Sequence, residues 1–286
     1  KGNIGLVLAL IGLISAAYAL INIPTLGIVA GLCSAMVLLM GFVGAGASLQ
    51  LERARSCHPD IAVDGVRSVL RILVLFALVT PFWSLFDQKA STWILQANDM
   101  VKPSWFEPAM MQALNPLLVM LLIPFNNFVL YPAIERMGIK LTALRKMGAG
   151  IAITGLSWIV VGTIQLMMDG GSALSIFWQI LPYALLTFGE VLVSATGLEF
   201  AYSQAPKAMK GTIMSFWTLS VTVGNLWVLL ANVSVKSPAV TEQIMQTGMS
   251  VTAFQMFFFA GFAILAALVF ALYARSYQMQ DHYRQV

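Results

Sequence analysis

Long apolar stretches separated by short polar segments dominate the sequence. Eight of these stretches are long enough to cross a hydrocarbon core about 30 Å thick as helices. They cover residues 4–22, 26–49, 69–97, 109–135, 147–168, 174–201, 211–232 and 252–274. The longest polar segment, residues 50–68, lies between the second and the third stretch. The pattern predicts an all-α polytopic membrane protein in which a two-helix transmembrane hairpin precedes six further spans.

The polar segments divide the chain into four parts. We expect an inserted transmembrane hairpin over 1–50, a cytoplasmic linker over 51–68, a six-helix bundle over 69–275 and a polar cytoplasmic tail over 276–286. The linker could include a short interfacial helix. The chain starts with Lys1 and carries neither an initiator Met nor a signal peptide. We therefore expect it to be a piece of a longer polypeptide.

Composition supports a membrane protein and argues against several other classes. Only 10% of the residues are charged, whereas a soluble domain carries about 25%. No basic patch indicates a nucleic-acid partner. The two cysteines, Cys33 and Cys57, lie at different depths and match no zinc or disulfide pattern. We expect no enzyme activity, no metal and no cofactor.

The positive charges lie mostly on one side of the predicted membrane. If the eight spans alternate in direction, thirteen of the 16 lysines and arginines fall on the side of both termini. These are Lys1, Arg53, Arg55, Arg67, Arg71, Arg136, Lys140, Arg145, Lys146, Lys207, Lys210, Arg275 and Arg284. The other side holds Lys102 and Lys236, and Lys89 lies within a span. We predict that both termini are cytoplasmic.

Glu190 is the most unusual residue of the chain, because it lies in the middle of the apolar stretch 174–201. A charge at mid-membrane costs roughly 2.5–3.5 kcal/mol on insertion scales. On an α-helix, Ser194, Gly197 and Leu198 would share the face of Glu190. This carboxylate is either a structural group paired with a basic residue on a neighbouring helix or a site for a cationic group or a proton.

Asp87 is the second acidic residue within a predicted span. Trp83 and Ser91 stand four residues before and after it and would share its face. Lys89 lies about 200° around the helix, so we expect it to serve another neighbour or to reach outward. Asp87 is either part of a structural charge network or a titratable gate that pairs with a basic residue outside this chain.

Further polar and aromatic groups lie at membrane depth. Asn115 precedes Pro116 in stretch 109–135, where proline frees a backbone carbonyl and bends a helix. This amide is either an interhelical contact or a ligand contact. Trp83 and Trp217 could line a pocket or pack in the interior, and their spacing does not distinguish the two.

Several motifs resemble the proton-dependent oligopeptide transporter family. They are FWSLFDQKASTW, LNPLL and FGEVLVSATGLEFAYSQAPKAMKGTIMSFW, together with the apolar hairpin before them. The run EFAYSQAP after a membrane-embedded glutamate is the most specific of them. The chain is most similar to the bacterial members, in which a hairpin separates two six-helix bundles. The family's ExxERF motif, which belongs to its N-terminal bundle, is absent from this sequence.

The resemblance implies a major facilitator fold and proton-coupled uptake of di- and tripeptides across the inner membrane by alternating access. Glu190, Asn115 and Ser194 would receive the peptide amino terminus, and Trp83 and Trp217 would line side-chain pockets. Leu198 would form the cytoplasmic gate. Asp87 would belong to the external gate and couple the proton. The partners would be peptides, protons, the lipid bilayer and an N-terminal six-helix bundle of the same polypeptide.

Two other functions remain open from the sequence alone. An acidic group in an aromatic pocket also suits a drug or cation antiporter of the same superfamily. A helical membrane subunit that transports nothing could hold the same charges as structural groups. If the chain is half of a transporter, Asp87, Asn115, Glu190, Ser194 and Trp217 should line one concave surface, with the hairpin packed outside it.

Overall fold

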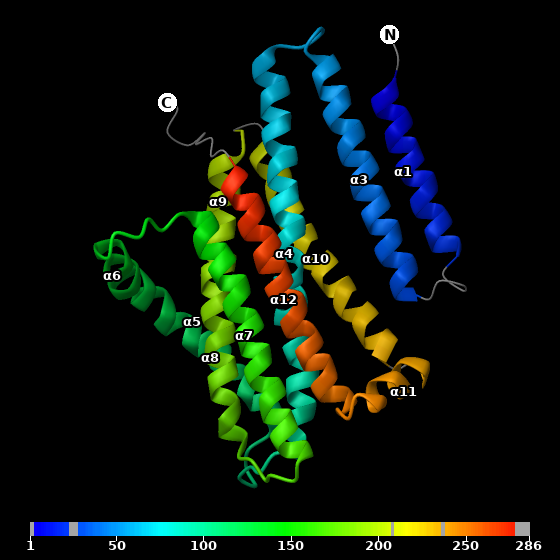
Figure 1. The fold of residues 1–286 in the computed structure, drawn as a ribbon. Helices are drawn as coiled ribbons and strands as arrows, with labels where there is room; N and C mark the ends of the chain where they lie inside the picture. The colour runs from blue at the N-terminus through cyan, green and yellow to red at the C-terminus, as the bar shows by residue number, and fades with distance from the viewer. Residues whose placement is uncertain (1–2, 23–27, 207–208, 236–237, 278–286) are drawn as a thin grey trace.

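A computed structural model describes residues 3–22, 28–206, 209–235 and 238–277 (Figure 1). All secondary-structure elements in these ranges are helical, and one isolated bridge joins Val101 and Ser175. The elements are α1 (Ile4–Ile21), α3 (Ile28–Ala54), α4 (Asp60–Asp99), η1 (Pro108–Ala113), α5 (Leu114–Phe125), η2 (Asn126–Leu130), α6 (Tyr131–Arg136), α7 (Ala143–Asp169), η3 (Ile176–Gln179), α8 (Ile180–Glu190), η4 (Val191–Ala195), α9 (Thr196–Gln204), α10 (Lys210–Val235), α11 (Pro238–Gln246) and α12 (Val251–Ser276).

The predicted spans correspond closely to these helices. Seven helical segments of the described ranges are long and apolar enough to cross a membrane. Helix α3, with 27 residues, occupies the position of the remaining predicted span. The fold class is therefore confirmed. Helix α11 was not predicted, because it lies in the segment between the expected spans 211–232 and 252–274.

Helices α1 and α3 form the hairpin, which stands beside the bundle (Figure 1). Their close approach depends on glycine, because a Cβ atom on Gly5 would lie 2.5 Å from the backbone oxygen of Gly46. On the outside, leucines and isoleucines such as Leu10 and Ile14 are exposed. These side chains suit contact with lipid.

Helix α4 starts earlier than predicted and changes the expected linker. It begins at Asp60 instead of residue 69, and α3 continues to Ala54, so most of segment 51–68 is helical. Ion pairs explain the extension. Arg55, between the two helices, contacts Glu52 at 3.1 Å, Asp60 at 3.0 Å and Asp64 at 2.5 Å. The division of the chain into hairpin, linker, bundle and tail remains a proposal.

The core of the bundle is rich in aromatic side chains. Trp93 packs against Trp158 and Tyr183, with ring centroids 5.5 and 4.9 Å apart. Beside these rings, the buried amide of Gln96 donates at 3.0 Å to Gln165 Oε1 and accepts from Gln179 at 2.9 Å. These bonds join α4, α7 and η3 within the apolar interior.

Two predicted spans are interrupted by π-helical turns. Stretch 109–135 contains the π turn η2, two residues after Pro124, and stretch 174–201 contains the π turn η4, directly after Glu190. Helix α5 has no buried residue. Figure 1 shows α5 and α6 leading away from α7, and a loop connects the end of α6 back to α7. Proline and the π turn are the local causes that bend this segment.

Candidate functional site

Glu190 is the last residue of α8 and borders the π turn η4. Its neighbour Gly189 allows this position to approach α7. A Cβ atom on Gly189 would collide with Thr154 Oγ1 and would lie 2.8 Å from the backbone oxygen of Gly150. The close packing of α8 on α7 therefore fixes the position of the Glu190 backbone relative to α7. π turns inside α-helices occur frequently at functional sites.

Asn115 holds the Glu190 carboxylate from the opposite helix. Its Nδ2 atom donates to Glu190 Oε2 at 2.6 Å and to Thr187 Oγ1 at 3.0 Å. Thr187 stands one helical turn before Glu190 on α8. The amide therefore makes an interhelical contact between α5 and α8. One oxygen of Glu190 receives this bond, and its other oxygen has no hydrogen-bond donor among the described residues.

Lys89 is the cation that acts most directly on Glu190. Its side chain is buried, and its Nζ atom lies 3.3 Å from the centroid of the Phe86 ring. Glu190 is its strongest electrostatic partner, ahead of Asp87. The prediction that Lys89 serves a neighbour other than Asp87 agrees with this geometry. Within the described ranges, however, every ion pair closer than 4.0 Å involves Arg55 or Arg67, so Glu190 and Lys89 are not in direct contact.

Asp87 is half-buried on α4 and lies near the side chain of Asn225 on α10, although no hydrogen bond of 3.5 Å or less joins the two within the described ranges. Ser91, expected on the same face, is exposed and donates to the backbone oxygen of Gln88 at 3.0 Å. The predicted stripe of Trp83, Asp87 and Ser91 is therefore not a continuous buried face. In the part of the chain that the structure describes, Asp87 makes no hydrogen bond to Asn115 or Glu190, but its charge acts on Glu190 directly, and both carboxylates act on Lys89.

The two tryptophans lie inside the bundle. Trp83 is 8% exposed and Trp217 is 7% exposed, and their rings meet edge to face with centroids 6.0 Å apart. Gly224 of α10 permits this packing, because its Cβ atom would lie 2.5 Å from Trp83 Cβ. The structure thus places both rings in the core, and the concave surface expected to include Trp217 stays a prediction.

The π turn changes the face that was predicted downstream of Glu190. Gly197 packs on the Trp217 ring and near Met147, whereas Glu190 contacts Asn115 on α5. The prediction that Glu190 and Gly197 share one face is wrong, because a π turn needs more residues than an α turn and shifts every later position around the axis. Leu198 is 40% exposed. No hydrogen bond joins Ser194 to Glu190 in the described part of the chain.

Two partners at the site were missed by sequence reasoning. Thr187 could have been found from its position three residues before Glu190, which places it on the same helical face. The proximity of Asn225 to Asp87 could not be predicted from the sequence, because it depends on how α10 packs on α4. No group of three or more metal-ligating side chains occurs within the described ranges.

A helical bundle that holds a carboxylate, an amide and an ammonium at membrane depth is typical of a polytopic transporter. Comparison with known proteins identifies its family. The POT family model matches residues 45–249 of the chain. The chain therefore belongs to the POT family, and the family predicted from its sequence motifs is confirmed.

Individual relatives agree with this assignment. A Caenorhabditis elegans protein named peptide transporter family 2 is 38% identical over 117 residues, which are 40% of this chain and 15% of that protein. Solute carrier family 15 member 2 of Mus musculus is 34% identical over 155 residues, covering 51% of this chain and 21% of the relative. The chain thus matches only a part of these longer proteins.

Solved structures match the whole chain. The crystal structure of the POT family transporter PepTSo is 95% identical with a TM-score of 0.89, and the match covers 99% of this chain and 56% of that one. The structure of an auto-inhibited POT family peptide transporter is 63% identical with a TM-score of 0.92 and covers 100% and 56% of the two chains. This chain accordingly spans about half the length of these transporters.

Proposed function

We propose that the protein carries di- and tripeptides across the inner membrane together with protons, by alternating access. The observation that carries this proposal is the Asn115–Glu190 pair, a carboxylate held at membrane depth with one oxygen free of donors among the described residues. Family membership supports it, because relatives of this chain are named peptide transporters. Family membership also favours peptide transport over a cation antiporter or a subunit that transports nothing.

The amino terminus of the peptide is the natural ligand of this carboxylate. An ammonium group donates up to three hydrogen bonds and carries the opposite charge, so it can use the oxygen that Asn115 leaves free. Asn115 and Thr187 fix the direction of the carboxylate in advance, which lowers the entropy lost on binding. Ser194, in the π turn, is proposed as a further polar contact to the substrate.

Lys89 gives Glu190 a resident counter-charge when no peptide is bound. The buried ammonium is attracted to Glu190 and Asp87 together, so it connects substrate binding with the proposed proton-coupling residue. Asp87 is proposed to change its protonation at the external gate. Leu198 is proposed to close the cytoplasmic side, and Trp83 and Trp217 to support the side-chain pockets from the core.

A second bundle completes the proposed mechanism. Alternating access places the site between two bundles that move against each other. We propose that an N-terminal six-helix bundle of the same polypeptide faces Asn115 and Glu190, and that both ends of the present segment are cytoplasmic. Protons are the coupling ion, and the proposal assigns no cofactor and no enzyme activity to the chain.

The full-length protein in vesicles with an imposed proton gradient tests this function. Uptake of a dipeptide with a free amine should be driven by the gradient, and Glu190→Gln should abolish it. Amine-blocked dipeptides should be transported poorly by both proteins, because they never use the contact with Glu190. Uptake by Glu190→Gln at the wild-type rate would refute the assignment. Efflux of lipophilic cations in place of peptide uptake would indicate the antiporter.

A further inference from the structure

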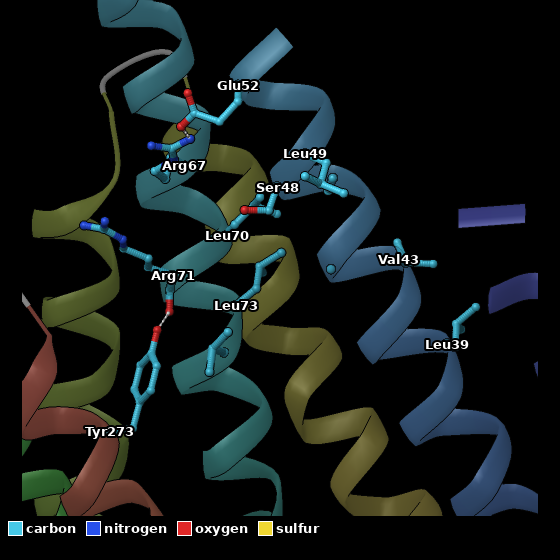
Figure 2. A pocket seen from close by; sticks show the side chains of 13 residues that line it. Leu39, Val43, Ser48, Leu49, Glu52, Arg67, Leu70, Arg71, Leu73 and Tyr273 are labelled. Carbon is cyan, nitrogen blue, oxygen red and sulfur yellow. Dashed lines mark hydrogen bonds and ion pairs between the residues drawn. The ribbon is translucent and has the colours of Figure 1, made fainter. Parts of the chain in front are cut away.

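A cavity of about 820 Å³ lies between the hairpin and the bundle, far from Glu190 in the sequence. Helix α3 lines one wall, α4 forms the floor and Tyr273 of α12 closes the other side (Figure 2). We call this cavity the hairpin groove. Its volume is in the range of sites that hold a small organic molecule.

The groove is apolar along most of its length and charged at one end. Leu39, Val43 and Leu49 of α3 face Leu70, Leu73 and Val74 of α4. Ser48, Glu52, Arg67 and Arg71 provide the polar end, next to the connection between α3 and α4 (Figure 2). A ligand that fits this profile has an apolar body and a polar head.

The charges at the polar end favour an anion. Arg67 is paired with Glu52, and Arg55 donates to Glu52 as well, so this acid is already neutralised. The Arg71 guanidinium forms no hydrogen bond or ion pair with the described part of the chain, whereas the Arg71 backbone oxygen accepts from Tyr273 Oη at 3.4 Å. Asp64 acts on Arg71 only at longer range and is itself bonded to Arg55. Among the charged side chains that line the groove, the two arginines therefore outnumber the one acid, Glu52.

A second cavity continues from the same arginine. It measures about 260 Å³ and is lined by Arg71, Tyr273, Ser276 and Tyr277, so it offers a guanidinium and three hydroxyl groups. Figure 2 shows the Arg71 side chain pointing away from α3, on the side of α4 where Tyr273 lies. Guanidinium forms bidentate hydrogen bonds with phosphate oxygens, and hydroxyl groups can complete the shell.

The position of Arg71 along α4 places it at the level of lipid head groups. Helix α4 has 40 residues and is about 60 Å long, twice the thickness of the hydrocarbon core. Arg71 is the last charged residue before the apolar run that continues to Asp87. Its guanidinium therefore stands where the apolar layer ends, with the groove extending from it toward the membrane interior.

We infer that the hairpin groove binds an anionic phospholipid. The acyl chains lie between α3 and α4, and the phosphate is held by Arg71 and the hydroxyl groups of the second cavity. A zwitterionic lipid fits less well, because the acid nearest to its ammonium group, Glu52, is already engaged by two arginines. The bound lipid would fill the space that separates the hairpin from the bundle.

The test uses the full-length protein in nanodiscs of phosphatidylcholine that contain a small fraction of photoactivatable phosphatidylglycerol. Cross-linked peptides from α3 and α4 are quantified by mass spectrometry. Arg71→Gln should reduce labelling by phosphatidylglycerol about tenfold, to the level of a photoactivatable phosphatidylcholine. Ala47→Trp, which fills the groove, should reduce labelling by both lipids.

Two variants serve as matched controls. Arg136→Gln removes an exposed arginine of α6, and Leu268→Trp adds the same ring to an exposed position of α12. Neither should change labelling of the groove. The proposal is refuted if Arg71→Gln is labelled like the wild type, if both lipids label equally, or if another part of the protein covers the groove and no label appears. Peptide uptake plays no part in this readout, so the proposed function is tested independently.

Discussion

Asn115 donates a 2.6 Å hydrogen bond to the carboxylate of Glu190 across 75 residues of sequence. The bond joins the first turn of α5 to the last residue of α8, two helices whose residues are mostly apolar. A hydrogen bond to a charged group contributes more than a neutral one, because the charge strengthens the bond. The pair is the centre of the proposed substrate site, and the first predictions concern it.

Removing the amide should weaken the substrate site without removing its charge. Asn115→Ala leaves Glu190 and Thr187 without their shared donor, and we expect uptake of free-amine dipeptides to fall about tenfold. Asn127→Ala is the control, since Asn127 is an exposed amide of the same helical segment. Initial uptake rates of the full-length protein measure the effect. Equal losses in both variants would point to a folding defect instead.

Removing the charge of Asp87 should uncouple the proton from the peptide. Asp87→Asn keeps the size and polarity of the side chain next to Asn225, but the side chain can no longer change its charge. We expect uphill, proton-driven uptake to be lost while counterflow exchange, which needs no net proton movement, continues. If both activities fall together at normal expression, Asp87 serves only to stabilise the fold.

A methyl group added at Gly189 should shift the backbone of α8 and with it the neighbouring Glu190. Gly189→Ala would force α8 away from Thr154 and Gly150 of α7. Overpacking of this kind costs about 1–3 kcal/mol, so we expect a lower melting temperature and slower uptake. Gly261→Ala is the control, because a Cβ atom on Gly261 has open space around it. A melting temperature unchanged by Gly189→Ala would contradict the tight contact.

The ion pairs at the hairpin should open in acid. Hydrogen bonds from Arg67, and then from Arg55, hold the pKa of Glu52 below its ordinary value of 4.5. A lowered folded-state pKa means that the stabilisation is complete above pH 4.5 and is lost as the pH falls through the lowered value. We therefore expect the start of α4 to separate from α3 only in strong acid.

Distance measurements between spin labels at Leu49 and Ile61 would detect this separation in a background in which both Cys33 and Cys57 are replaced by serine. The distance should stay constant from pH 8 to pH 5 and increase below about pH 4. Glu52→Gln should remove this contribution, because the side chain no longer titrates. An identical pH profile in Glu52→Gln would show that another group controls the separation.

The sequence predicts the membrane helices well, because long apolar runs have few alternatives in a bilayer. It also identifies Glu190, Asn115 and Asp87 as unusual residues at membrane depth. It does not reveal the π turn after Glu190, since nothing in VLVSA distinguishes this turn from an α turn. The extension of α4 to Asp60 was missed for a different reason: its cause is a set of ion pairs that form only when α3 and α4 are side by side.

Tertiary packing determines the rest of the site. The positions of Trp83 and Trp217 in the sequence suit either a pocket or the core. In the structure both side chains pack in the core, because Gly197 and Gly224 carry no Cβ atom that would collide with them. Likewise, Lys89 acts on Glu190 because α4 and α8 meet in the bundle, although the two residues are a hundred positions apart. Such relations depend on the order of the helices in space, which apolar periodicity does not encode.

The unbroken helix α4 has a consequence for the movement of the whole protein. It carries Asp87 in its second half, and ion pairs of Arg67 and Arg55 join its beginning to the hairpin. If α4 tilts during the transport cycle, the hairpin must be displaced sideways through the surrounding bilayer. The friction of the lipids then acts directly on that step. The turnover rate would accordingly depend on membrane viscosity, and a stiff, ordered bilayer would slow the protein even with its site chemistry unchanged.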